Sequence, residues 1–141
     1  MAKMIKILLA EDSKFIRLST ERALMRAGYT VISVGDGDEV VRTAREKSPD
    51  LILLDMLLPK MTGPDVLKAL KKDQATAMIP VVVFTGLSQK NAARLEGDGA
   101  FAFLEKAELQ LEQGTGKLLE ALEKIVERLP GKTARGAAAD G

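Results

Sequence analysis

Five residues that could do chemistry follow or end short apolar runs along the 141-residue chain: Glu11, Asp12, Asp55, Thr85 and Lys106. Three of them are carboxylates, which repel one another unless a cation lies among them. Oxygen ligands without His or Cys suit a hard ion such as Mg²⁺. With a lysine and a hydroxyl added, such a site can stabilise a phosphoryl group, and one carboxylate can accept it as an aspartyl phosphate.

Each of these residues taken alone has a simpler interpretation. Asp55 could be a turn or cap residue, and Glu11 and Asp12 could cap the helix that follows them. Thr85 could be an ordinary strand-end threonine, and Lys106 a solvated lysine. Together, however, these five residues lie at the ends of four separate predicted strands, and capping alone is a poor explanation of that pattern. We therefore interpret them as one site.

Short apolar runs alternate with amphipathic helical patterns, and this alternation predicts the fold. We expect strands at 4–10, 29–34, 51–54, 80–85 and 100–105, and helices at 13–27, 36–47, 62–72, 88–96 and 117–129. Such a pattern is typical of α/β proteins with a parallel sheet covered on both faces. Right-handed crossovers favour the flavodoxin-like doubly wound (βα)5 fold, a five-stranded parallel sheet in the order 2-1-3-4-5. In that order Asp12 and Asp55 follow adjacent strands.

Composition narrows the class of function. The chain has no Cys, no His and a formal net charge of +1. The lack of His and Cys excludes the usual serine and cysteine nucleophile systems and most zinc sites. The charge gives no sign of direct nucleic-acid binding, and no apolar run is long enough for a membrane helix. We expect one domain over residues 1–129, and a flexible tail or linker stub over 130–141.

The sequence resembles the response-regulator receiver domain of two-component signalling over about residues 4–129. DMLLPKMTG, which begins at Asp55, resembles the phosphoacceptor segment of that family, and ILLAED, VVVFTG and GAFAFLEK resemble its other strand-end signatures. The resemblance implies that Asp55 accepts a phosphoryl group from the phosphohistidine of a sensor histidine kinase or a histidine phosphotransfer protein. It also implies a Mg²⁺ site made by Glu11, Asp12, Asp55 and the backbone carbonyl of Leu57. We expect Asp12 to contact the ion directly and Glu11 through water.

The resemblance also implies how the signal spreads. Thr85 and Lys106 would contact the phosphoryl group, and Phe103 would turn inward when Thr85 moves toward it. This would switch the surface of the fourth helix, the fifth strand and the last helix, which binds an unknown downstream protein or a second copy in a possible homodimer. A receiver of this kind is a cytoplasmic signalling protein that catalyses only its own phosphorylation and dephosphorylation, and we do not expect an enzyme.

Two departures from the family pattern affect the site. Gly86 follows Thr85 where the family usually has Ala, and Ala107 follows Lys106 where it usually has Pro after a cis peptide bond. A cis bond before a residue other than proline is costly, which leaves the geometry of the bond between Lys106 and Ala107 open. The segment 107–116 is also longer than the usual connection, so we expect it to be remodelled.

Three other interpretations stay open at this point. The chain could be a degenerate receiver that acts as an interaction adaptor without phosphorylation. A haloacid-dehalogenase-like phosphatase also uses a strand-end Asp, but it needs a second Asp where Leu57 stands, and a cap domain. A flavin-binding protein of the same fold needs a loop rich in glycine and hydroxyl groups after the first strand, where Glu11 and Asp12 would repel phosphate.

Overall fold

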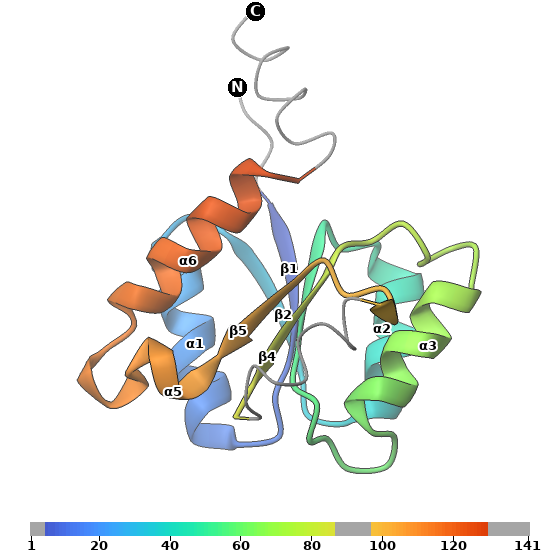
Figure 1. Ribbon diagram of the computed structural model, residues 1–141, viewed down its shortest axis with the longest axis horizontal. Coiled ribbons are helices and arrows are strands. Elements are labelled where there is room, and N and C mark those ends of the chain that lie inside the picture. Colours follow the sequence, from blue (N-terminus) through green and yellow to red (C-terminus); the bar gives the residue numbers. More distant parts are fainter. Residues whose placement is uncertain (1–4, 87–96, 130–141) are drawn as a thin grey trace, which may run out of the picture.

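The described part of the chain, residues 5–86 and 97–129 of a computed structural model, contains one five-stranded parallel sheet. The strand order is β2-β1-β3-β4-β5, which confirms the predicted flavodoxin-like fold (Figure 1). The strands are β1 Lys6–Ala10, β2 Thr30–Val34, β3 Leu51–Leu54, β4 Val81–Thr85 and β5 Ala102–Glu105.

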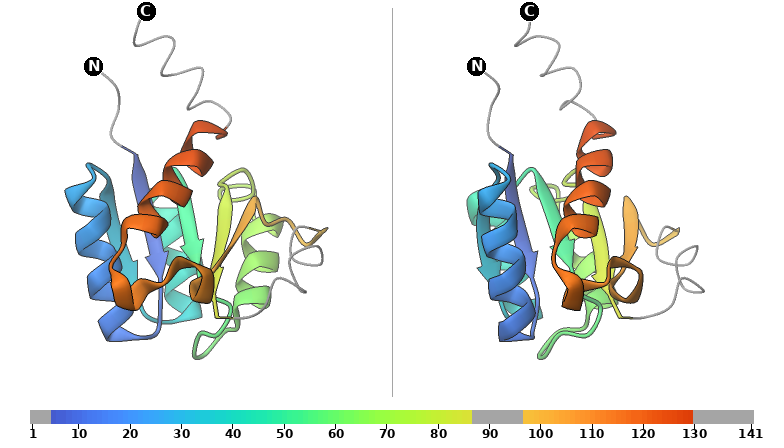
Figure 2. Two further views of the ribbon diagram at one scale, coloured as in Figure 1. Left: turned by 60° about the vertical axis from the view of Figure 1, so that its left-hand side comes forward. Right: turned by 90° about the vertical axis from the view of Figure 1, so that its left-hand side faces the viewer.

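Helices cover both faces of the sheet. Helices α2 and α3 lie on one face, and α1 and α6 lie on the other (Figures 1 and 2). The helical segments are α1 Lys14–Arg26, α2 Gly37–Lys47, α3 Gly63–Lys72, α5 Lys106–Leu109, the short 3-10 helix η2 Leu111–Gln113, and α6 Gly116–Glu127. None of the helices in the described ranges is long and apolar enough to cross a bilayer.

Two apolar cores explain why the strands are apolar without interruption. Successive side chains of a strand point to opposite faces, so a sheet covered on both faces buries all of them. In β3, Ile52 packs in the core shared with α2 and α3, and Leu53 packs in the core shared with α1 and α6. All residues of β3 are buried. The polar Asp55 comes directly after this strand, at its carboxyl end.

The segment between β5 and α6 contains two short helical segments. Helix α5 begins at Lys106 itself, and Gln110, in the left-handed conformation with φ of 50°, separates α5 from η2. The described residues contain no cis peptide bond, so the bond between Lys106 and Ala107 is trans. The predicted helix over 88–96 and the predicted tail over 130–141 lie outside the described residues and stay predictions.

Candidate functional site

Adjacent strands bring Glu11 and Asp55 together at the carboxyl edge of the sheet. Ala10 lies opposite Leu54 in the pairing of β1 with β3, and the Asp55 backbone N–H donates to the Ala10 carbonyl over 3.1 Å. Both acidic residues are buried: Glu11 is 1% exposed and Asp55 is 5% exposed. Carboxylates are rarely buried without partners, so their partners define the site.

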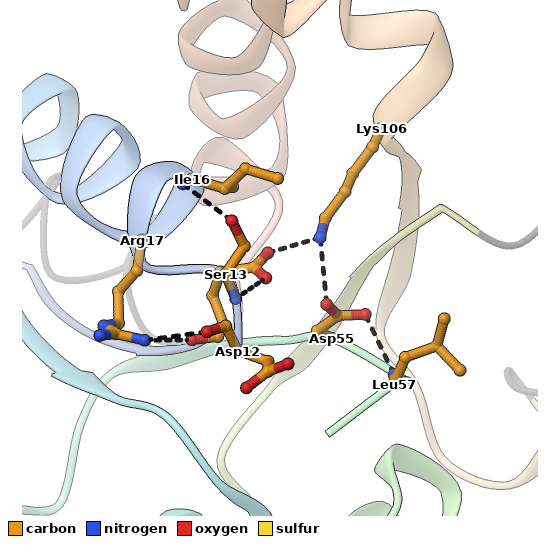
Figure 3. A network of polar contacts seen from close by, with 8 residues as sticks. Asp12, Ser13, Ile16, Arg17, Asp55, Leu57 and Lys106 are labelled. Atoms are coloured by element: carbon orange, nitrogen blue, oxygen red, sulfur yellow. Dashed lines mark hydrogen bonds and ion pairs between the residues drawn. The ribbon is translucent and has the colours of Figure 1, made fainter. Parts of the chain in front are cut away.

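Lys106 connects the two buried carboxylates. Its Nζ donates to Oε1 of Glu11 over 2.5 Å and to Oδ2 of Asp55 over 3.0 Å (Figure 3). The same Nζ lies 5.1 Å from the ring centroid of Phe84, a distance at which a cation and an aromatic face attract each other. One ammonium thus faces two carboxylates, which leaves an excess of negative charge in a buried site.

Two backbone N–H groups hold the carboxylates in place. The Ser13 N–H donates to Oε2 of Glu11 over 2.9 Å, and the Leu57 N–H donates to Oδ1 of Asp55 over 3.1 Å. Burial raises the pKa of Glu11 above its ordinary value, and the charge of Asp55 acts in the same direction. Lys106 and the Ser13 N–H lower that pKa, but burial outweighs them. Glu11 therefore holds a proton more readily than an exposed glutamate.

Because the pKa of Glu11 is higher in the folded state than in the unfolded chain, ionisation of Glu11 at rising pH should lower the free energy of unfolding. The Glu11 contribution is fully present below the ordinary value of 4.5, and it is lost as pH rises through the higher pKa of the folded state. Glu11→Gln lacks this loss and keeps one oxygen that can accept from Lys106, although its amide nitrogen cannot accept from the Ser13 N–H. At neutral pH its free energy of unfolding should exceed that of the parent by on the order of 1 kcal/mol, and the difference should narrow in acid.

Urea unfolding at a series of pH values, without added metal, measures the difference between Glu11→Gln and the parent. Glu46→Gln, which changes an exposed glutamate of α2, is the matched control and should follow the parent at every pH. A parent that is as stable as Glu11→Gln across the whole series would show that the buried carboxylate carries no such cost.

Asp12 and the Leu57 side chain lie toward solvent. Asp12 is exposed, and its carboxylate points away from Lys106 in Figure 3. Leu57 is 63% exposed. Across residues 5–86 and 97–129, no three acidic side chains lie close enough together to hold a metal ion. The structure thus brings Glu11 and Asp55 together, and it leaves Asp12 beside them with its carboxylate turned outward.

These residues nonetheless fit a divalent cation by their chemistry. All the atoms that could coordinate an ion here are oxygens. Two buried carboxylates share one ammonium, so the negative charge of the site exceeds the positive charge. The exposed Asp12 carboxylate has room to turn, because no packing against the core fixes it. Glu11, Asp12, Asp55 and the Leu57 carbonyl would hold such an ion.

Thr85 and Phe103 lie on the next two strands. Thr85 ends β4, which neighbours β3, and it is fully buried opposite Glu105 of β5. Phe103 lies on β5, three residues before Lys106, and is half-buried against the core shared with α2 and α3. Both residues therefore occupy strands that lead to the edge where Asp55 and Lys106 meet.

The loop between Asp55 and α3 is anchored to the start of α2, a contact that sequence reasoning missed. The Gly37 N–H donates to the Pro59 carbonyl over 3.2 Å, and Lys60 Nζ lies 3.5 Å from Oδ2 of Asp36. A Cβ at Gly37 would lie 2.1 Å from the Met61 carbonyl oxygen, so only glycine allows this approach. The glycine after an acidic cap residue was the available signal.

Comparisons with known proteins bear on the family and the fold of the chain. Residues 7–123 match the family model of the response regulator receiver domain. The chain is 38% identical to the gliding motility regulatory protein of Myxococcus xanthus over 126 residues, which are 88% of this chain and 16% of that protein. Its fold is similar to chemotaxis response regulator CheY4 of Vibrio cholerae, with a TM-score of 0.77 and 28% identity over 87% of this chain and 99% of that one.

A further similar structure is the receiver domain of sensor histidine kinase PA1611 from Pseudomonas aeruginosa, which is described with a magnesium ion coordinated in its active-site cleft. Its TM-score is 0.73 at 26% identity, over 90% of this chain and 98% of that one. Because the family model covers most of the chain, the protein belongs to the response regulator receiver domain family of two-component signalling. This match favours the receiver over the phosphatase and the flavin-binding protein considered from the sequence. The chain spans only 16% of the length of the Myxococcus relative.

Proposed function

We propose that this receiver accepts a phosphoryl group from the phosphohistidine of a partner protein onto Asp55. The observation that carries the proposal is the environment of the Asp55 carboxylate, which lies at a strand end and is held by Lys106 and the Leu57 N–H. These two donors orient the carboxylate toward an incoming phosphorus, and orientation of this kind lowers the barrier to transfer.

In the proposed reaction a carboxylate oxygen of Asp55 attacks the phosphorus atom. The bond from phosphorus to the donor imidazole nitrogen breaks, and its electron pair stays with the imidazole. Lys106, already 3.0 Å from Oδ2 of Asp55, can follow the negative charge onto the phosphoryl oxygens, and the Thr85 hydroxyl is proposed to contact the same group. The partner is proposed to be a sensor histidine kinase or a histidine phosphotransfer protein.

Mg²⁺ is proposed as the cofactor. When bound, it supplies neutralisation of the charge on the phosphoryl oxygens. Glu11, Asp12, Asp55 and the Leu57 carbonyl are the proposed ligands, supported by their oxygen-only donor set and excess negative charge. The magnesium ion described for the PA1611 receiver domain supports the same proposal.

The proposed output is a change of surface. When Thr85 moves toward the phosphoryl group, Phe103 is proposed to turn inward and alter the surface around β5 and α6; the predicted fourth helix, 88–96, lies outside the described residues. That surface is proposed to bind a downstream protein or a second copy of the chain. The protein is proposed to work in the cytoplasm as a signalling protein, not as an enzyme, and without direct contact to nucleic acid or membrane.

Incubation with a small phosphodonor tests the proposal directly. With acetyl phosphate and Mg²⁺, intact-protein mass spectrometry is expected to show the gain of one phosphoryl group, and a metal chelator is expected to prevent it. A parent protein that gains no phosphoryl group under these conditions would contradict the proposal and favour the adaptor interpretation.

A further inference from the structure

The side chain of Arg17 holds the backbone of the acidic pair Glu11–Asp12. Its Nη1 donates to the Glu11 carbonyl over 2.8 Å and to the Asp12 carbonyl over 3.3 Å (Figure 3). Both carbonyls lie just past the end of β1 at Ala10, where the chain leaves the sheet. A guanidinium therefore ties together two consecutive peptide groups that have left the regular strand pairing.

The residues between the acidic pair and Arg17 form a closed local unit. The Ser13 side chain caps α1 by accepting from the Ile16 N–H over 3.3 Å, and the Ser13 carbonyl accepts from the Arg17 N–H over 2.8 Å. The same Ser13 donates its own N–H to the Glu11 carboxylate. The first turn of α1 thus fixes the backbone of Arg17, and its side chain reaches back to the acidic pair.

A second turn closes the space around the guanidinium. A Cβ at Gly35, in the turn between β2 and α2, would lie 3.3 Å from Nη1 of Arg17. The glycine therefore leaves room for the guanidinium, with little to spare. Arg17 lies on the opposite side of Asp12 from Lys106 in Figure 3, so it faces the backbone of the pair and not the carboxylate of Asp55.

We propose that Arg17 is a positioning residue for the metal site, an inference that rests on the proposed Mg²⁺-dependent function. Holding two consecutive carbonyls fixes the peptide planes of Glu11 and Asp12, and with them the direction of each Cα–Cβ bond, while the exposed Asp12 carboxylate can still turn about its side-chain bonds. Groups that hold the metal-binding residues in place raise the affinity of the site for the ion. The ion then has to order fewer chain groups when it binds, so binding costs less conformational entropy.

The positive charge of Arg17 and its hydrogen bonds should have opposite effects on the affinity of the site for Mg²⁺. A guanidinium near the acidic pair repels a second cation, so loss of its charge alone would strengthen Mg²⁺ binding. Loss of its hydrogen bonds to the two carbonyls would weaken Mg²⁺ binding. The two roles predict opposite changes in affinity.

Magnesium titration without a phosphodonor separates these two roles. Arg17→Met is expected to bind Mg²⁺ about tenfold more weakly than the parent, measured by calorimetry or by amide shifts in NMR spectra. Arg17→Lys keeps the charge and a donor, but it lacks the planar guanidinium that places Nη1 between the two carbonyls, and it is expected to bind about threefold more weakly. Arg22→Met, an exposed arginine of the same helix, is the matched control and should bind as the parent does.

Phosphorylation by acetyl phosphate gives a second measurement. In Arg17→Met the Mg²⁺ concentration for half-maximal rate is expected to rise by the same factor as the dissociation constant, while the rate at saturating Mg²⁺ stays near that of the parent. A purely structural defect would lower the saturating rate instead.

Several results would overturn the inference. Mg²⁺ binding by Arg17→Met as tight as in the parent, or tighter, would do so while leaving the proposed function intact. If Arg17→Met does not fold, parent-like affinity in Arg17→Lys would have the same meaning. A parent without measurable Mg²⁺ binding would contradict the metal part of the proposed function itself, and the inference with it.

Discussion

Asp55→Asn is expected to lose the phosphoryl increment from acetyl phosphate completely, which corresponds to a rate reduced by more than about a thousandfold. The amide has nearly the shape of the carboxylate, and its oxygen can still accept from the Leu57 N–H, now 3.1 Å from Oδ1. Its nitrogen, however, is a poor nucleophile and cannot accept from Lys106. The variant therefore removes the chemistry and leaves most of the packing.

Mass spectrometry of intact protein measures this loss, and circular dichroism checks that the variant is folded. Asp38→Asn, which changes an exposed aspartate of α2, is the matched control and should gain one phosphoryl group like the parent. An undiminished increment in Asp55→Asn would place the phosphoryl group on another side chain and would refute the central proposal.

The fold was predictable because its strongest signals are local. Each strand is an apolar run that both faces of the sheet bury, as in Leu51–Leu54, and each helix between strands shows an apolar stripe. Right-handed crossovers then leave few strand orders, so the neighbouring positions of β1 and β3 followed. The meeting of Glu11, Asp55 and Lys106 is a consequence of that order, since parallel strands end at one edge.

The contacts that sequence reasoning missed depend on the exact path of side chains. Arg17 is one of several charged residues of α1, and nothing in the sequence predicts its approach to two carbonyls past β1. The contact of Lys60 with Asp36 joins two loops, and loop geometry follows from packing more than from propensity. The outward direction of the Asp12 carboxylate could not be predicted either, because this exposed side chain is not fixed by the core.

The helix that begins at Lys106 is another feature that could not be predicted from the sequence. The sequence predicted only that the connection after β5 is remodelled. Ala107 has a high helix propensity, and α5 begins at Lys106 with the peptide bond to Ala107 in the trans form. A helix of four residues depends on its surroundings more than on propensity, so its presence could not be predicted from the sequence.

Lys106→Met is expected to destabilise the protein by roughly 3–5 kcal/mol at neutral pH, because it leaves Glu11 and Asp55 buried without the ammonium that connects them. Lys106 lowers the pKa of Glu11, so its removal raises that pKa further. The deficit should therefore be largest at high pH and should shrink as pH falls toward 4.5, the ordinary value for Glu11. Urea unfolding across pH measures it, with Lys68→Met, an exposed lysine of α3, as the control.

Coupling between Lys106 and Glu11 gives a sharper test of this explanation. If the deficit arises from an uncompensated buried charge, Glu11→Gln should recover part of it in the Lys106→Met background, and the two substitutions should not be additive. Additive changes would show that Lys106 stabilises the fold through its alkyl chain and its contact with Phe84, which lies 5.1 Å from Nζ.

The same lysine is expected to matter for phosphoryl transfer beyond its effect on stability. Lys106→Arg keeps the positive charge beside Glu11 and Asp55 and should therefore be more stable than Lys106→Met. A planar guanidinium is bulkier than an ammonium and cannot take the same place between Asp55 and an incoming phosphoryl group. Both Lys106→Arg and Lys106→Met should accept phosphate from acetyl phosphate about a hundredfold more slowly, when assayed where each is folded. Parent-like rates in folded Lys106→Met would confine the role of Lys106 to the stability of the acidic site.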